Sequence, residues 1–200
     1  MRRIVAGFFQ SLDGVVQSPG APDEDRDGGF ASGGWVMPHF DETVGGFIDE
    51  IFAGPFDLLL GRRTYDIFAG HWPKMSGEPL ADGINRAVKF VVTSREPETG
   101  WAGTRRLRDF DEIAAAKASE GPDILVQGSS TLYPELLRRR LIDRLFLVTF
   151  PIVLGRGKRA LDGAPPLGLT LVDTRIAPSG VVITVFERPG DLKIEAVPTA

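Results

Sequence analysis

The sequence predicts a single α/β domain in which a mainly parallel central sheet carries antiparallel strands at its C-terminal edge. Short, nearly continuous apolar runs alternate with helical patterns through residue 141, as is typical of parallel strands buried on both faces. Beyond residue 141, strands follow one another without helices between them. A chain of 200 residues with 42% hydrophobic content suits one domain that has a core and a ligand cleft.

The first four strands are expected where apolar runs are bounded by Gly, Pro or Asp. They are residues 3–9, 56–60, 89–94 and 123–127. Between the first two, apolar residues from Phe40 to Phe52 share one face of a helix. Asp109 and Glu112 form a capping box that opens a second helix, and a leucine pattern beginning at residue 132 marks another.

The C-terminal part of the chain predicts the antiparallel strands. They are residues 144–154, 169–177 and 181–188, the last two joined by a Pro-Ser-Gly turn. We therefore expect one domain over residues 1–188, followed by a short tail over residues 189–200.

Composition excludes several classes of function. The net charge is −4 and the acidic residues are spread along the chain, so no broad basic face is expected for nucleic acid. There is no cysteine, which removes disulfides and thiolate chemistry and favours the cytoplasm. No apolar stretch approaches the ~20 residues that a membrane-spanning helix needs. We expect a cytoplasmic protein that binds a small molecule.

Three predicted strand ends carry small, hydroxyl or arginine residues. They are Gly61-Arg62-Arg63-Thr64, Thr93-Ser94-Arg95 and Gly128-Ser129-Ser130. A strand end that leads into a helix presents free N–H groups and a positive dipole end, which suit phosphate. Taken alone, the arginine pair could equally be a solvated pair beside an ordinary helix cap. The three segments together favour a nucleotide diphosphate that spans several strands.

Two other patterns resemble ligand motifs but lack their context. Residues 155–160, GRGKRA, fit a dinucleotide fingerprint, but the following LDGAPPLG cannot continue a helix. Residues 23–28, DEDRDG, copy half of a calcium loop, yet Gly34 stands where a bidentate glutamate is needed. His39 and His71 are 32 positions apart without a third clustered ligand. No metal site is expected.

Five short segments, in order, carry a family resemblance. They are SLDG (11–14), GRRTY (61–65), QGSSTL (127–132), LIDRL (141–145) and PIVLGRGKRAL (151–161). They resemble the reductase domain at the C-terminus of the bifunctional riboflavin-biosynthesis deaminase-reductase, over roughly residues 1–188. GRRTYDIF and QGSSTLY also resemble the cofactor segments of dihydrofolate reductases. The resemblance implies a dihydrofolate reductase-like three-layer sandwich with NADPH as hydride donor.

The resemblance also implies roles for individual residues. Arg62 would meet the 2′-phosphate of NADPH, with Ser94 and Arg95 beside it. The pyrophosphate would lie against Arg63 and Thr64 and the following loop. The cofactor-binding set expected on this basis is Gly61, Arg62, Arg63, Thr64, Thr93, Ser94, Arg95, Gln127, Gly128, Ser129, Ser130 and Leu132.

Candidates for catalysis come from the segments near the expected nicotinamide position. Asp13 belongs to the Ser-x-Asp-Gly turn but could simply hold that turn. Asp41 lies where dihydrofolate reductases place a proton-donating carboxylate, although it is equally placed as a helix N-cap. Trp35 could stack on a flat ring or belong to the core. These three residues are the expected catalytic set.

Gln127 departs from the riboflavin enzymes, which usually have glutamate just before the glycine of this loop. The loss of charge weakens the case for their substrate, 5-amino-6-(5-phosphoribosylamino)uracil. No deaminase half is present in this sequence either. The leading hypothesis is an NADPH-dependent reductase of a small heteroaromatic or carbonyl substrate, with that pyrimidine as the family default. The alternatives are a dihydrofolate reductase and a non-catalytic NADPH-binding module. Long apolar strands near the C-terminus favour a homodimer.

Overall fold

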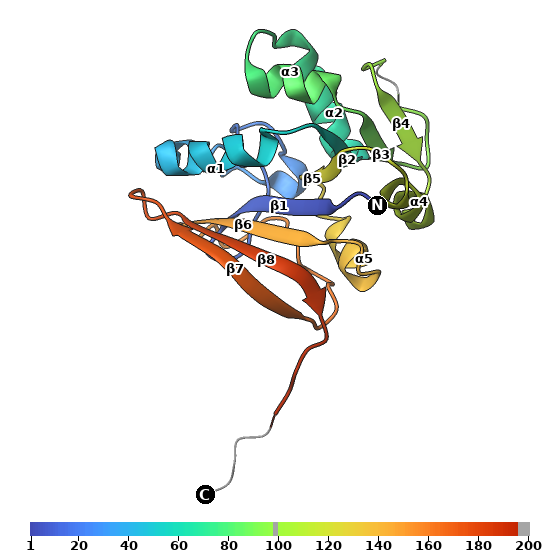
Figure 1. Ribbon diagram of the computed structural model, residues 1–200. Helices are drawn as coiled ribbons and strands as arrows, with labels where there is room; N and C mark the ends of the chain where they lie inside the picture. The colour runs from blue at the N-terminus through green and yellow to red at the C-terminus, as the bar shows by residue number, and fades with distance from the viewer. Residues whose placement is uncertain (98–99, 196–200) are drawn as a thin grey trace, which may run out of the picture.

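The computed structural model, which describes residues 1–97 and 100–195, contains an eight-stranded sheet in the order β4-β3-β2-β5-β1-β6-β8-β7 (Figure 1). The strands are β1 (Ile4–Ser11), β2 (Phe56–Gly61), β3 (Lys89–Val92), β4 (Thr104–Leu107), β5 (Asp123–Gln127), β6 (Arg144–Phe150), β7 (Gly168–Ile176) and β8 (Val182–Gly190). Strands β1 to β6 pair in parallel, whereas β8 pairs antiparallel with β6 and β7. The predicted fold class is confirmed.

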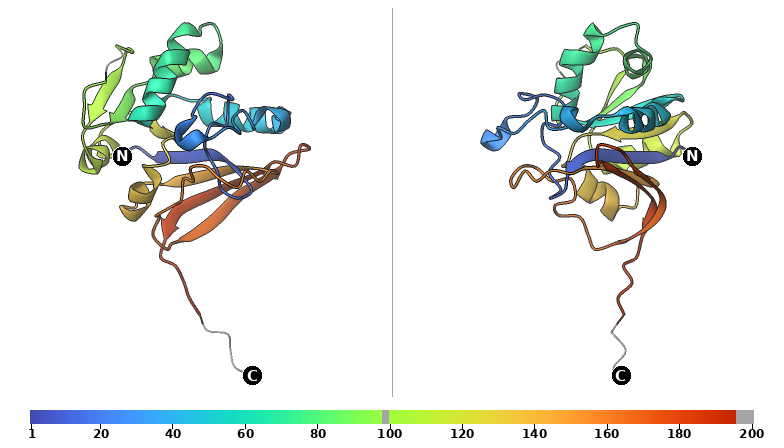
Figure 2. Two further views of the ribbon diagram at one scale, coloured as in Figure 1. Left: turned by 180° about the vertical axis from the view of Figure 1, so that it is seen from behind. Right: turned by 90° about the vertical axis from the view of Figure 1, so that its left-hand side faces the viewer.

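Helices cover both faces of this sheet. The α-helices are α1 (Glu42–Phe52), α2 (Arg62–His71), α3 (Pro79–Arg86), α4 (Phe110–Ala118) and α5 (Tyr133–Arg138). Three short 3-10 helices are η1 (Asp27–Gly29), η2 (Met37–His39) and η3 (Trp72–Lys74). Figure 2 shows the cyan and green helices α1 to α3 on one side of the sheet and the yellow α5 on the other.

Alternating strand residues build a separate core on each face. In β2, Leu58 and Leu60 pack with α1 and α2, while Leu59 packs with α4 and α5. In β1, Val5 belongs to the first cluster and Ile4 to the second. This two-sided burial is why the strands have nearly continuous apolar sequences. The result is the expected three-layer arrangement.

Several element boundaries differ from the expectation. Strand β6 ends at Phe150, four residues early, because Pro151 has no N–H with which to continue the ladder. Strand β8 continues to Gly190 and so includes the first two residues of the predicted tail. Residues 196–200 of that tail lie outside the described residues.

Two aspartates cap helices as local sequence suggests, with one difference. Asp109 accepts the N–H groups of Asp111 and Glu112 at the start of α4. Glu112, however, accepts the N–H of Arg108 rather than that of Asp109, so the capping box is displaced by one residue.

The amino ends of the parallel strands are closed by buried ion pairs. Arg2 pairs with Asp57, and Lys117 pairs with Asp143. Every one of these four side chains is nearly inaccessible to solvent. These charges are satisfied by each other and by backbone groups, and they lie at the opposite end of the strands from the cavity described next.

Candidate functional site

A cavity of about 650 Å³ opens at the carboxyl ends of the parallel strands. Its lining comes from the ends of β1, β2 and β5, from the loop after β1, and from α1, α2 and α3. In open α/β sheets, ligands bind outside the carboxyl ends of the strands. The cavity is therefore the principal candidate site.

Two of the predicted phosphate segments meet in this cavity. The hydroxyl of Ser129 accepts the N–H of Gly61 at 2.6 Å and donates to Thr64 Oγ1 at 2.9 Å. Gly128 and Ser129 both have φ near +60°, a conformation that a non-glycine residue holds only when its surroundings require it. A Cβ on Gly128 would lie 2.9 Å from Thr64 Cγ2. The loop after β5 is thus locked against the start of α2.

Helix α2 begins without a side-chain cap, as α3 and α5 also do. Asp41 caps α1 and Asp109 caps α4, but in the described part of the chain no side chain caps α2. Gly61, Arg62, Arg63 and Thr64 all line the cavity. The positive end of the helix dipole therefore faces the space in which an anion would bind.

The two arginines of this turn differ in their partners. Arg62 Nε lies 2.8 Å from Asp66 Oδ2 within the same helix, and 29% of the Arg62 side chain is exposed. Arg63 is 57% exposed and reaches across to the loop after β1, where it lies 2.7 Å from Asp27 Oδ2 and 3.5 Å from Asp25 Oδ1.

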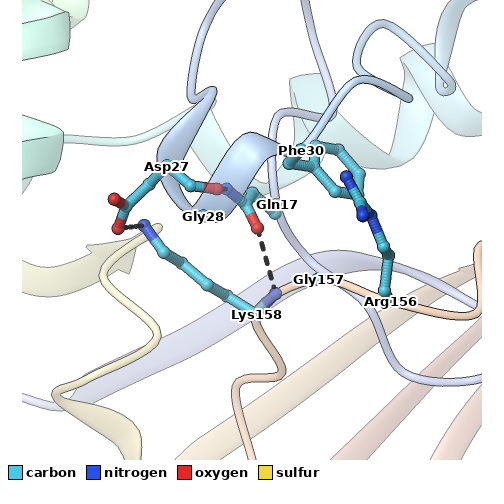
Figure 3. Close-up of a pocket in the computed structure, with 7 residues that line it drawn as sticks. All are labelled: Gln17, Asp27, Gly28, Phe30, Arg156, Gly157 and Lys158. Carbon is cyan, nitrogen blue, oxygen red and sulfur yellow. Dashed lines mark hydrogen bonds and ion pairs between the residues drawn. The ribbon is translucent and has the colours of Figure 1, made fainter.

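Lys158 completes this charged cluster from a distant segment (Figure 3). Its Nζ lies 2.7 Å from Asp25 Oδ2 and 3.0 Å from Asp27 Oδ2, while its backbone N–H donates to Gln17 Oε1. Hydrogen bonds from Lys158 and Arg63 lower the pKa of Asp27 to about 2. From the sequence, no role was assigned to Lys158, because residues 155–160 were weighed as a dinucleotide fingerprint and as part of a family segment, and neither points to a contact with Asp25 and Asp27. The segment forms bends and one isolated β-bridge, and no helix follows it directly.

The third predicted segment lies beside the first but outside the cavity lining. Val92 at the end of β3 pairs with Gly61 at the end of β2, so Thr93 and the residues after it follow next to the start of α2. Arg106 of β4 donates to the carbonyl groups of Thr93 and Ser94 and so holds this turn. Arg95 is exposed.

Leu132 and Gln127, also predicted to bind cofactor, take different positions. Leu132 is buried in the core between the sheet and α5 rather than in the cavity lining. Gln127 lines the cavity at the end of β5. Ser130 lines it one residue beyond Ser129.

The three catalytic candidates are not among the described residues that line the cavity. Asp41 accepts the N–H groups of Thr43, Val44 and Ser179. Trp35 is buried, and its indole N–H donates to the carbonyl of Gln17 at 2.9 Å. These contacts account for both residues structurally, so their catalytic role stays a prediction.

Asp13 is the centre of a turn rather than a cavity residue. It accepts the hydroxyl of Ser11 at 2.6 Å and the N–H groups of Leu154 and Gly155. These bonds, with the Ser11 hydroxyl first, lower the pKa of Asp13 to about 2. Asp13 therefore ties the turn after β1 to the segment after β6, and its catalytic role likewise stays a prediction.

Neither a cluster of metal ligands nor a membrane-spanning helix is found in the part of the chain that the structure describes. Among residues 1–97 and 100–195, no group of three or more His, Asp or Glu side chains is arranged to hold a metal ion. No helix within these ranges is both long and apolar enough to cross a membrane.

Comparisons with known proteins extend over nearly the whole chain. The chain is 25% identical over 195 residues to the uncharacterized protein YyaP of Bacillus subtilis (strain 168), which covers 94% of this chain and 96% of that protein. A provisionally named riboflavin biosynthesis protein from Shewanella sp. PV-4 aligns with a TM-score of 0.63 at 19% identity, over 93% of this chain and 98% of that one. Dihydrofolate reductase from Enterococcus faecalis, complexed with NADP(H) and RAB-propyl, aligns with a TM-score of 0.59 at 18% identity, over 93% and 96%.

These likenesses show the dihydrofolate reductase-like fold that the sequence predicted. The model of the RibD C-terminal domain matches residues 2–183. This chain belongs to the RibD C-terminal domain family.

Proposed function

We propose that the protein is an NADPH-dependent reductase of a small organic substrate. One observation carries this proposal: Ser129 joins the loop after β5 to the start of α2, whose N–H groups have no side-chain cap in the described structure. This cradle opens into a cavity large enough for a ligand of several rings. Family membership and the NADP(H) complex of the Enterococcus faecalis enzyme support the same proposal.

The residues present fit a dinucleotide phosphate. Because Gly128 has no Cβ, which would lie 2.9 Å from Thr64 Cγ2, the loop after β5 packs closely against the start of α2 and brings both segments to one place in the cavity. Arg63 adds positive charge at the same place. Arg62 would hold the 2′-phosphate, with Ser94 and Arg95 on the adjoining strand end. Bound NADPH would supply a hydride, while the protein binds, orients and shields the reactants.

The alternative functions make different demands on the cavity. A dihydrofolate reductase needs a proton donor near the pterin, yet the carboxylates that line the cavity, Glu24, Asp25 and Asp27, all come from one loop. Asp25 and Asp27 are already paired with Arg63 and Lys158. Reduction of 5-amino-6-(5-phosphoribosylamino)uracil remains the family default. A non-catalytic module would bind NADPH without turnover.

Titration and turnover test the proposal together. NADPH should bind with a dissociation constant in the micromolar range, measured by calorimetry at fixed salt. Ser129→Ala should weaken this binding, because it removes the hydroxyl that joins the two loops, whereas Ser119→Ala at the end of α4 should leave it unchanged. NADPH oxidation is then measured with dihydrofolate, the pyrimidine and a panel of carbonyl compounds. Failure of NADPH to bind would reject the proposal. Binding without turnover on any substrate would favour the non-catalytic module.

We also propose that the protein forms a homodimer through β7. This strand is an edge of the sheet and exposes Leu169, Leu171, Val172 and Ile176. An exposed apolar edge is usually covered in a soluble protein. Light scattering should report twice the chain mass of 21.7 kDa at micromolar concentration. A stable monomer would contradict the proposal.

A further inference from the structure

One wall of the cavity is apolar and rich in aromatic rings. We call it the apolar wall, and it consists of Phe9, Ile48, Phe52, Phe68, Trp72 and Leu80. All six side chains are partly buried and pack against the same core cluster, on the face of the sheet covered by α1, α2 and α3. The wall therefore forms one continuous surface at the site, distinct from the cradle at the start of α2.

The charged side chains of the cavity lie away from this wall. In the described lining they come from the loop at residues 24–27, from the first turn of α2 and from Lys158. Glu24 accepts the N–H groups of Gly20 and Ala21. The remaining charges form the pairs described above. None of the described lining residues contributed by α1, η3 or α3 is charged.

The apolar wall offers no polar partner to a charged group of a substrate. A phosphate or carboxylate placed there would lose its water without gaining a partner, and unpaired burial of a charge costs several kcal/mol. A flat, uncharged ring gains both buried area and edge-to-face contacts with aromatic side chains. The rings of Phe68 and Trp72 are already arranged in this way, 6.0 Å apart at 69°.

The lining also limits the chemistry of the hydride acceptor. The hydroxyl of Tyr133 donates to the carbonyl of Gly7 at 2.7 Å in a fully buried position, so its proton is committed. None of the six wall side chains carries an ionisable proton either, so an acceptor bound at the wall must accept hydride without a proton from the wall. Conjugated carbonyl compounds do so, because the added electron pair is delocalised onto oxygen as an enolate or phenolate.

We infer that the substrate is an uncharged, planar, conjugated carbonyl compound of the quinone class, bound against the apolar wall. This inference rests on the proposed reductase function. The step balances: a C–H bond of the reduced nicotinamide breaks, its hydride adds to the conjugated carbonyl, and the resulting oxyanion takes a proton from water. The dinucleotide is oxidised by two electrons and the carbonyl compound is reduced by two.

Binding in the absence of cofactor tests the inference separately from turnover. The probe is 2-methyl-1,4-naphthoquinone, titrated into the full chain by calorimetry, with 5-amino-6-(5-phosphoribosylamino)uracil as the competing ligand. Leu80→Glu places a charge on the wall at a partly exposed position. It should lower the affinity for the naphthoquinone at least tenfold and leave the affinity for NADPH unchanged. Leu80→Met keeps the wall apolar and should retain binding within about threefold.

Two further variants make the outcome decisive. Phe68→Ala removes one ring from the wall and should also lower the affinity for the naphthoquinone. It serves as the test if thermal unfolding shows that Leu80→Glu does not fold. Leu192→Glu, in the exposed segment after β8, should have no effect on this binding.

The outcomes separate this inference from the proposed function. Absence of naphthoquinone binding, equal affinity in wild type and Leu80→Glu, or tighter binding of the phosphorylated pyrimidine would overturn the inference. If NADPH fails to bind the same preparations, the proposed function fails, whereas the affinity of the wall for the probe is still measured.

Discussion

Replacing Arg62 with alanine should weaken the binding of NADPH much more than the binding of NADH. The two nucleotides differ by one phosphate, which carries close to two negative charges at neutral pH. A charge-assisted hydrogen bond to that phosphate contributes about 1.5–3 kcal/mol. To make it, Arg62 must release or share Asp66, its partner at 2.8 Å in the next turn of α2. An exposed pair of this kind stabilises by about 0.3–0.5 kcal/mol.

The balance leaves about 1–2.5 kcal/mol, so Arg62→Ala should lower the affinity for NADPH by roughly fivefold to seventyfold. The affinity for NADH should change less than about twofold. Arg63→Ala is the matched control, since Arg63 is expected beside the pyrophosphate that both nucleotides share. This variant should lower the affinity for NADPH and for NADH alike. Calorimetric titration of wild type and both variants at fixed salt measures these ratios. Equal losses for the two nucleotides in Arg62→Ala, or equal affinities in wild type, would refute the assignment of Arg62.

Three further predictions concern stability, pH and assembly. Asp143→Ala should lower the free energy of unfolding by about 3–5 kcal/mol in urea titrations, because it leaves Lys117 buried without its partner. Asp123→Ala, which breaks an exposed pair, should lower it by less than about 1 kcal/mol. Similar losses in both variants would contradict the reasoning. Asp13→Asn should lower Tm at pH 7, because a neighbouring serine hydroxyl and two backbone N–H groups lower the pKa of Asp13 from 3.8 to about 2 in the folded state. A carboxylate whose pKa is lowered on folding stabilises the protein fully above its unfolded-state pKa, and this stabilisation is lost as pH falls through the folded-state pKa. The difference in Tm between the variant and wild type should therefore shrink from pH 4 to pH 2, and a constant difference would argue against this role. Ile176→Lys, at a side chain that is 74% exposed on β7, should convert the proposed dimer to monomer in light scattering, and an unchanged dimer mass would place the interface elsewhere.

The sequence predicted the fold and the segments that meet at the start of α2 because both depend on local patterns. Apolar runs between turn residues identify buried strands, and parallel strands align their carboxyl ends at one edge of the sheet. Segments that follow neighbouring strands must therefore meet, as Gly61 and Ser129 do. The separate position of Thr93 depends on Arg106, which holds that turn from the next strand, and no local pattern announces such a contact.

The rest of the site depends on tertiary packing. Lys158 reaches the cavity from a segment 133 residues away from its partner Asp25, so no spacing rule identifies it. The local sequence around Asp41 suits either a helix cap or a proton donor, and the contacts of its carboxylate with the N–H groups of Thr43, Val44 and Ser179 show how it is engaged. The apolar wall was not predicted either, because side chains on α1, α2 and α3 could equally have been core residues.

The structure of the protein with NADPH bound would test the central claim most directly. We expect the pyrophosphate between the first turn of α2 and Gly128–Ser130, and the 2′-phosphate against the guanidinium of Arg62. The nicotinamide ring should lie next to the space that the apolar wall leaves for a substrate. A dinucleotide bound outside this cavity, or one whose pyrophosphate does not contact the start of α2, would contradict it.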